Sequence, residues 1–353
     1  MSAANLDGAD LAAVNLGGLI NEDVMQQIFD ISDIPLPFTD RIGSGSHDNS
    51  FAEWTMDRLA APATDNAVVD GADAGTDDSS SGIRVGNHSQ ISQKTLRVST
   101  RAQDSSTIGF ANSLAYQVMM RGNEARRDVE AIMVGQQASV ADDGALVPGL
   151  SAGLGAWIVG TDIFAAATLS ADRGALGADG GWLDTSTDGL VATPTPGTVR
   201  ALSLSTIQDV AQSVWELGGD PTAVMTTPAV VRSLSTFMFT SSAQIATLER
   251  DRGEMGAAQA QMSVNVLITD FGVTMSIIPN RLQQLVTTDN ANVYIMDFSQ
   301  AMQSFLTGWQ TAPLARTGTA DNRQVSADWM LKVLNWESFG VVADINGALA
   351  TEA

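Results

Sequence analysis

The chain has 353 residues, of which 44% are hydrophobic, so it can bury one large core or two modest ones. It carries 40 acidic and 18 basic residues, a formal net charge of −22, and no cysteine. This composition excludes disulfides, a thiol nucleophile and a cysteine-based zinc site, and the lack of a lysine and arginine stripe argues against a reader of nucleic acid.

The N-terminal residues are predicted to form an arm outside the core. Residues 1–20 are mostly small and have no basic n-region, so we expect no secretory signal there. No apolar run in the chain reaches the ~18 residues of a membrane span. A short helix is expected after Asn21, and Pro35 and Pro37 end it. Its apolar positions are Val24, Met25, Ile28 and Phe29.

Residues Ser44–Gly86, with a strand returning through Ile91–Val98, are predicted to form a long excursion shaped like a β-hairpin. Its first part is polar and rich in turn-forming residues, with Phe51 and Trp54 as isolated aromatic anchors. The segment Lys94–Thr100 is rich in β-branched residues, as is typical of a half-buried strand. Ordered excursions of this length usually mediate contacts or carry function.

The segment Ser105–Gln137 is predicted to be one long amphipathic helix. Apolar and small residues recur every three or four positions from Ile108 to Ile132, and charged residues fill the other side. At about 1.5 Å per residue this helix would be roughly 50 Å long. Such a length favours a structural spine, although an ordinary long core helix would show the same pattern.

The second half of the chain mixes helices and strands without a regular βαβ alternation, which indicates an α+β fold. Residues 149–200 are rich in Gly, Ala and Thr and look irregular. A helix is expected from Ser205, with Gln208 at the capping-box position, and a second helix begins at Pro228. The expected strands are Ala223–Thr226, Val264–Thr269, Val273–Ile278, Val293–Asp297 and Val325–Val333.

The search for catalytic and cofactor chemistry is mostly negative. The two histidines, His47 and His88, lie in the polar excursion without the spacing of a triad or a metal site, and there is no P-loop or dinucleotide-binding fingerprint. The weak candidates for a metal site are the carboxylates of Asp70, Asp73, Asp77 and Asp78. They lack the spacing of an EF-hand loop, so we expect no cofactor beyond loosely bound Mg²⁺ or other salt cations.

The acidic composition itself is informative. Lys94 and Lys332 are the two lysines of the chain, and aspartate outnumbers glutamate more than threefold. Concentrated salt screens carboxylates from one another, because the Debye length falls to about 3 Å at 1 M. The composition therefore favours a protein from a halophile over a merely acidic one.

Short motifs in a fixed order carry a resemblance to a known family. They are Glu53-Trp54, Asp57, Leu59, Arg84, Asn87, Gln90-Ile91, Val98-Ser99, Arg127-Asp128-Val129-Glu130, Phe271-Gly272, Asp297, Leu314-Ala315-Arg316-Thr317-Gly318, Asn335 and Gly340. Over about Pro35–Ile345 the order resembles that of tailed-phage major head proteins with the Hong Kong 97-type capsid fold. Relatives often carry lysine where Arg316 stands.

The resemblance implies an α+β fold with a long spine helix, an extended loop, and peripheral and axial domains. On this basis we expect an N-terminal arm at 1–46 and the extended loop at 47–104. The spine helix and first part of the peripheral domain would occupy 105–197, the axial domain 198–285, and C-terminal strands returning to the peripheral domain 286–353.

The resemblance also implies a structural major capsid protein of the virion, not an enzyme. It would assemble in the host cytoplasm as hexamers and pentamers into an icosahedral head. It would enclose double-stranded DNA without sequence-specific binding, beside a portal and decoration proteins, with no membrane partner. The residues expected at subunit contacts are Phe51, Trp54, Arg84, Arg126, Arg127 and Arg316. The acidic, lysine-poor composition departs from that of ordinary bacteriophage relatives and points to a virus of a halophilic archaeon.

Three alternatives stay open at this stage. An encapsulin-type cargo shell shares the fold. An acidic, halophilic surface-layer or adhesion protein would share the composition but should carry a signal peptide. An acidic hydrolase would need a cleft with paired carboxylates.

Overall fold

The computed structural model describes most of the chain beyond its N-terminal segment. The described residues are 35–57, 59, 62–71, 73, 75, 83–105, 113–158, 183–184, 190–191, 193–194, 199, 201–240, 266–285, 290–316 and 318–346. The expected N-terminal arm up to residue 34, with its short helix, and the acidic residues Asp77 and Asp78 lie outside them.

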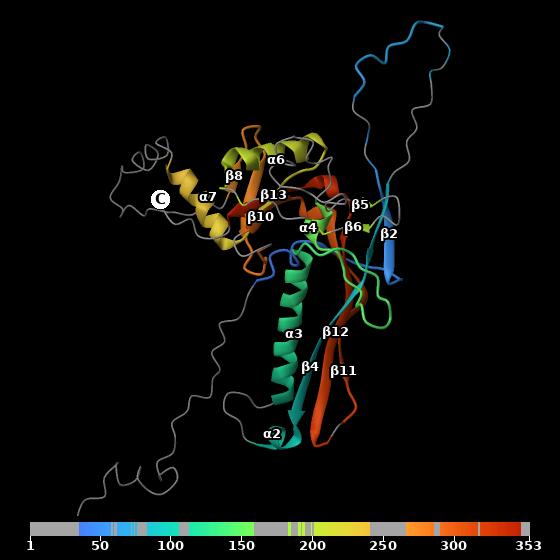
Figure 1. Cartoon of the computed structure of the whole chain (residues 1–353), viewed down its shortest axis with the longest axis vertical. Coiled ribbons are helices and arrows are strands. Elements are labelled where there is room, and N and C mark those ends of the chain that lie inside the picture. The colour runs from blue at the N-terminus through green and yellow to red at the C-terminus, as the bar shows by residue number, and fades with distance from the viewer. Residues whose placement is uncertain are drawn as a thin grey trace, which may run out of the picture.

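A four-stranded sheet forms one half of the molecule (Figure 1). Its strand order is β1-β11-β12-β4, with β1 parallel to β11 and the other neighbours antiparallel. The strands are β1 (Gly43–Ser46), β11 (Ala301–Pro313), β12 (Ala320–Val333) and β4 (Gln90–Ser99). Every second side chain of β12 from Val325 to Val333 is buried, which confirms the face predicted from the sequence.

Helix α3 (Ser113–Met133) packs on β4 and β12 and is the spine of this half (Figure 1). Its 21 described residues span about 32 Å. The helix ends at Met133 and not at the expected Gln137, and it does not begin at Ser105, whose backbone is extended. Residues 106–112 of the expected helix lie outside the described residues. Ser99 caps a separate short helix, α2 (Thr100–Asp104), and Ser105 ends it in an extended conformation. At the other end, the Gln137 side chain folds back and donates to the carbonyl of Ile132 at 2.6 Å.

A five-stranded sheet forms the other half, with the order β13-β10-β7-β9-β8. The strands are β13 (Phe339–Asn346), β10 (Asn290–Met296), β7 (Ala223–Thr226), β9 (Thr274–Pro279) and β8 (Val266–Ile268). Helix α6 (Leu204–Glu216) packs on β13 and β10, and α7 (Pro228–Thr240) packs on β9. β10 and β13 therefore join this sheet, whereas β11 and β12 of the same C-terminal region join the four-stranded one.

The start of α6 differs from the predicted capping box. Ser203 is the N-cap residue, and it makes no side-chain capping bond. The Gln208 side chain donates instead to Asp270 at 3.1 Å, outside the helix. A tertiary partner has therefore replaced the local bond that the sequence pattern predicted.

The shorter elements complete the described fold. They are β2 (Phe51–Met56), β3 (Ile83–His88), α4 (Leu154–Trp157), β5 (Leu183–Asp184), β6 (Leu190–Val191) and the 3₁₀ turns η1 (Phe298–Gln300) and η2 (Trp336–Ser338). None of the helices in the described part of the chain combines the length and the apolar character that crossing a membrane would need.

A buried carboxylate joins the two halves. Glu130 on α3 is 0% exposed, and its two oxygens accept four hydrogen bonds. The donors are the backbone N–H groups of Phe38 and Thr39, the Thr39 hydroxyl and the Asn280 side-chain amide, at 2.5–2.9 Å. A buried charge is tolerated when its hydrogen bonds are complete. Glu130 thus fixes the segment at Phe38 and Thr39, and the residue that follows β9, to the spine helix.

Candidate inter-subunit surface

The β2–β3 hairpin is anchored to its own chain at its base. The two strands pair antiparallel from Phe51 opposite His88 to Met56 opposite Ile83. The Trp54 indole N–H donates to the carbonyl of Val333 at 3.0 Å. Its ring centroid lies 5.4 Å from that of Trp157. Trp54 was predicted at a subunit contact, but these interactions are within one chain.

Phe51 is likewise engaged inside the hairpin. Its ring centroid lies 4.6 Å from that of His88. The ring also covers Gly86, where an added Cβ would lie 2.4 Å from the Phe51 ring. Phe51 is half-buried, so only part of its ring is left for any neighbour.

The described part of the connection between β2 and β3, which includes residues 62–71, extends away from the rest of the molecule (Figure 1). Three large apolar residues of this connection are almost fully exposed: Leu59 is 96% exposed, Val68 81% and Val69 79%. Asp65 and Asp70 accompany them in sequence and are also exposed. Exposed apolar side chains gathered on one segment mark an interaction site more often than scattered ones do. Sequence reasoning noticed the acids of this segment and missed the apolar residues.

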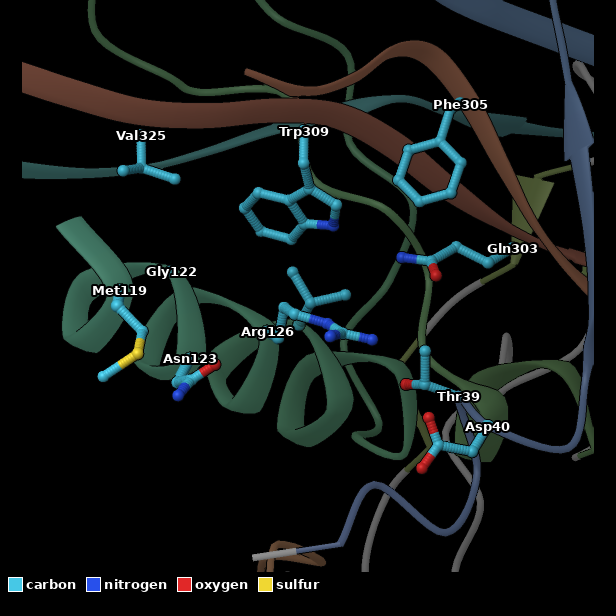
Figure 2. Close-up of a pocket in the computed structure, with 11 residues that line it drawn as sticks. Thr39, Asp40, Met119, Gly122, Asn123, Arg126, Gln303, Phe305, Trp309 and Val325 are labelled. Carbon is cyan, nitrogen blue, oxygen red and sulfur yellow. The ribbon is translucent and has the colours of Figure 1, made fainter. Parts of the chain in front are cut away.

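A groove lies between the spine helix and the four-stranded sheet (Figure 2). Its volume is about 520 Å³. Phe305 and Trp309 of β11 point toward α3 from one side, and Met119 and Arg126 of α3 form the other side. The remaining lining residues are Thr39, Asp40, Gly122, Asn123, Val129, Gln303 and Val325. Arg126 is exposed at this groove, which is the one predicted contact residue that lines it.

Two other predicted arginines form exposed ion pairs. Arg84 pairs with Glu53 across the β2–β3 ladder, and the side-chain hydrogen bond to that carboxylate raises the pKa of the guanidinium. Arg316 pairs with Asp321 at 2.7 Å, and its hydrogen bond lowers the pKa of the Asp321 carboxyl. Because both ion pairs are exposed, both arginines are accessible to a neighbouring surface. Exposed pairs of this kind also contribute little to stability.

Arg127 is placed differently from the other predicted arginines. It lies on α3 and is half-buried, and its Nε has no hydrogen-bond partner within the described part of the chain. It does not line the groove that contains Arg126. The adjacent arginines therefore differ in accessibility, and Arg126 is the better candidate for a contact.

The residues that the sequence offered as metal or catalytic candidates do not come together in one site among the described residues. Asp70 and Asp73 are exposed, and no group of three His, Cys, Asp or Glu side chains among the described residues is arranged to hold a metal ion. His47 is buried with its Nδ1 3.0 Å from the Ser304 hydroxyl, and burial lowers the pKa of the imidazole. His88 contacts the Ser139 hydroxyl at 3.0 Å. His47 thus contacts β11 of the four-stranded sheet, and His88 of β3 contacts the loop that follows α3.

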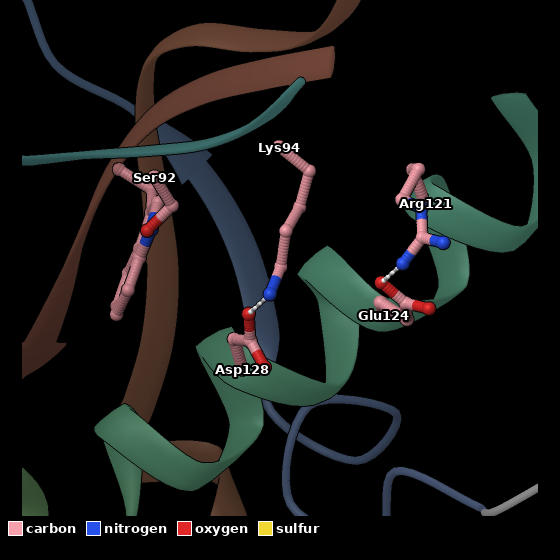
Figure 3. Close-up of polar contacts among 6 residues, drawn as sticks. Ser92, Lys94, Arg121, Glu124 and Asp128 are labelled. Carbon is pink, nitrogen blue, oxygen red and sulfur yellow. Dashed lines mark hydrogen bonds and ion pairs between the residues drawn. The ribbon is translucent and has the colours of Figure 1, made fainter. Parts of the chain in front are cut away.

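Lys94 is held against the spine helix (Figure 3). Its ammonium lies 2.6 Å from the Asp128 carboxylate, and Arg121 and Glu124 form a second pair on the same helix. This is the lysine nearest the hairpin in sequence. Its amine is occupied by a carboxylate of its own chain.

A second exposed loop was missed by the sequence reasoning. The Asp143 carboxylate accepts the N–H groups of Ala145, Leu146 and Val147 at 2.8–2.9 Å, and these bonds lower its pKa. Leu146 stands 92% exposed on this loop. The signal was present in the sequence, because Asp followed by Gly144 is a turn-forming pair.

Comparison with known families identifies a match over nearly the whole chain. A family model described as the SU10 major capsid protein matches residues 6–346. The major capsid protein of Escherichia phage Phieco32 is 32% identical over 102 residues. That match spans 29% of this chain and 29% of the length of the phage protein.

Solved capsid structures share the fold at low sequence identity. The capsid of a native GTA particle gives a TM-score of 0.58 at 9% identity, covering 94% of this chain and 98% of that one. The capsid of cyanophage A-1(L) gives 0.55 at 9% identity, covering 93% and 97%. Mycobacterium phage Bobi gives 0.54 at 11% identity, covering 97% and 99%. The architecture is thus the Hong Kong 97-like capsid fold expected from the motifs.

Proposed function

The chain belongs to the SU10 major capsid protein family, and we propose that its copies assemble as hexamers and pentamers into the closed icosahedral head of a tailed phage. As a major capsid protein it is a structural component of the virion and not an enzyme. The single observation that carries the assembly proposal is the family match over residues 6–346. The exposed β2–β3 connection supports it, since a subunit that is complete alone has little use for such a segment.

We propose that the β2–β3 connection of one copy docks into the groove between α3 and β11 of the next. Leu59, Val68 and Val69 are exposed, and the groove offers Phe305 and Trp309 to cover such side chains. Arg126, exposed at the groove beside Asp40, would pair with Asp65 or Asp70, the acids on either side of the two valines. Charge pairs at an interface rim favour encounter and register more than affinity.

The proposed domains follow the two sheets. The four-stranded sheet with α3 would be the peripheral domain, and the five-stranded sheet with α6 and α7 the axial domain. The projecting loop is then shorter than the expected 47–104, because β4 pairs with β12 over ten positions from Gln90 to Ser99. The strands β10 and β13 pair within the axial sheet, so 286–353 would serve both domains.

The proposal includes what the head contains and which proteins complete it. A shell subunit with a net charge of −22 repels DNA, so double-stranded DNA would be enclosed without being gripped. A portal would occupy one vertex, and decoration proteins would bind the outer surface. These partners are proposed from the family resemblance alone.

We further propose that the shell is adapted to concentrated salt and that the host is a halophilic archaeon. The support is compositional: an excess of aspartate, two lysines and a charge of −22 per copy. The named relative comes from an Escherichia phage, so the host proposal rests on composition alone. Dialysis tests it: light scattering should show shells intact in molar NaCl and dissociating at low salt, where the Debye length reaches about 30 Å at 0.01 M. Shells equally stable at both extremes would remove the salt and host proposals.

Electron microscopy of the purified full chain in molar salt tests assembly and docking together. Wild type should form closed shells, and Val68→Asp with Val69→Asp should yield unassembled subunits or isolated capsomers. Val266→Asp, at an exposed apolar position on the edge strand β8, is the matched control and should still form shells. Shells from the loop variant would refute the docking contact, and no shells from wild type would refute the assembly proposal.

A further inference from the structure

One end of the five-stranded sheet contains a bulge that redirects an acidic side chain. Ala291 pairs with Ile345 and Val293 with Val342, so β13 has one more residue than β10 between these pairs. Asp344 lies in the bulge with φ 59°, and no other non-glycine residue in the described chain has a positive φ. Bulges aim side chains away from the regular alternation, and strained residues gather at functional sites.

The redirected carboxylate meets a buried polar residue of the neighbouring strand. Asp344 Oδ1 accepts a hydrogen bond from the Asn290 side chain at 2.6 Å. β10 is regular here, so Asn290, Asn292 and Tyr294 point to the same face of the sheet. Asn292 therefore lies on the same face as the Asn290–Asp344 pair.

Two further polar residues complete the cluster. The Gln283 side-chain amide donates to the backbone carbonyl of Asn292 at 2.7 Å. The Thr226 hydroxyl donates to the backbone carbonyl of Asn292 at 3.0 Å, so Thr227, the next residue, lies at the same end of the sheet.

The cluster has more hydrogen-bonding capacity than the described chain satisfies. Within the described residues, Thr227 Oγ1, Gln283 Oε1, Asn290 Oδ1 and Asn292 Oδ1 have no hydrogen-bond partner, and neither does Asn292 Nδ2. These four side chains and Asp344 are each 7% exposed or less. Folded proteins leave few buried polar atoms unpaired, and such a concentration at one sheet end calls for a bound group.

We propose that Thr227, Gln283, Asn290, Asn292 and Asp344 form an internal binding site for a hard cation, with Ca²⁺ the best fit. The available ligands are amide and hydroxyl oxygens with one carboxylate, and the cluster offers no sulfur or imidazole. Ca²⁺ accepts about 6–8 such oxygens in irregular geometry, whereas Mg²⁺ requires a near-octahedral shell and usually keeps several waters. A water on the cation would accept the hydrogen bond that Asn292 Nδ2 can donate.

This site would act on the subunit and not on contacts between subunits. The bound ion would link β10, the β13 bulge, the residue after β7 and the segment that contains Gln283. It is distinct from the exposed Asp70 and Asp73, which would bind cations loosely and from solvent.

The test uses the full-length chain, freed of divalent ions with a chelator and returned to Ca²⁺ or Mg²⁺ in the same monovalent salt. Ca²⁺ near 100 times its dissociation constant should raise the thermal midpoint by about 3–4 °C, and Mg²⁺ should raise it less. Elemental analysis after gel filtration should find one Ca²⁺ retained per chain. Asn292→Leu and Asp344→Asn should abolish both effects.

Asp73→Asn is the matched control for cation binding by the acidic surface, and it should keep the Ca²⁺ shift. Asn292→Leu also shows whether the site holds an ion. Without an ion, removing unpaired polar atoms should leave stability equal or higher and should not change any response to Ca²⁺. An equal Ca²⁺ response in wild type and Asn292→Leu, or equal shifts with Ca²⁺ and Mg²⁺, would overturn the proposal.

Discussion

The connection between β2 and β3 and the five-stranded sheet bury their apolar residues in opposite ways. All seven residues of β10 are buried, and of the eight in β13 only the last is exposed. The hairpin strands bury Met56 and Val85, but the connection between them exposes Leu59, Val68 and Val69. One region completes its own packing, and the other leaves apolar surface to be covered from outside.

The comparison teaches where stability and assembly reside in this subunit. Burial within the five-stranded sheet and around Glu130 supports the fold of a single copy. The projecting connection has no comparable burial, so its apolar residues can contribute only when a second surface meets them. The two regions should therefore respond to mutation in different measurements.

The largest expected effect is the loss of assembly when the connection is removed. Replacing residues 57–82 with an Asn-Gly turn joins β2 to β3 directly and keeps the Trp54 anchor at the base. The shortened chain should fold with nearly the same circular dichroism and thermal midpoint, but electron microscopy should show no closed shells. Complete shells from this variant would show that the connection is not an assembly element.

The next effect should appear in folding. Each oxygen of Glu130 accepts two hydrogen bonds, and Glu130→Gln replaces one of these oxygens with an N–H₂ group. That group donates and cannot accept, so the donors that faced the lost oxygen lose their acceptor. We expect a loss of about 2–4 kcal/mol in the free energy of unfolding, measured with urea. Glu124→Gln, at a partly exposed pair with Arg121 on the same helix, should cost less than about 1 kcal/mol. Equal losses for the two variants would contradict the role of Glu130.

A smaller effect is expected from pH at His47, which lies between β1 and β2. Burial lowers the pKa of His47 below 6.5, so the folded chain prefers the neutral imidazole. The unfolded chain takes up this proton first, and the corresponding stability is present above about pH 6.5 and lost as pH falls toward the folded-state pKa. Between about pH 7.5 and 5.5 the urea midpoint of wild type should therefore fall more than that of His47→Asn.

His88→Gln is the control for that pH experiment, because it removes the other histidine of the chain. It should keep the wild-type pH dependence. If His47→Asn titrates like wild type, the His47 proton does not contribute to stability.

The smallest expected effect concerns Lys94. Its pair with Asp128 at 2.6 Å is partly exposed, so Lys94→Met should change the free energy of unfolding by less than about 1 kcal/mol. Lys94 lies in a paired strand against α3, so its amine is not placed to join a neighbouring subunit covalently. Denaturing gels of wild-type shells should show a single band at the mass of one chain. A ladder of covalent multimers would contradict this prediction.

Local patterns predicted the elements better than their ends. The alternation in Val325–Val333 predicted the buried face of β12, because a strand has a period of two residues wherever it lies. The periodicity of the long helix could not show that Ser99 caps a separate turn or that the helix stops at Met133. Ends depend on capping bonds and on partners such as Gln137, and those are set by the fold.

The sequence by itself determined the acidic, cysteine-free character of this protein, its α+β elements and, through ordered motifs, its capsid fold. These features depend on composition and on patterns among neighbouring residues. Only the tertiary structure brought Glu130 to Thr39 and Asn280, Arg126 to Trp309, and Asp344 to Asn290. Such groups lie far apart in the chain, and no local pattern encodes which distant side chain will complete a buried charge or a groove.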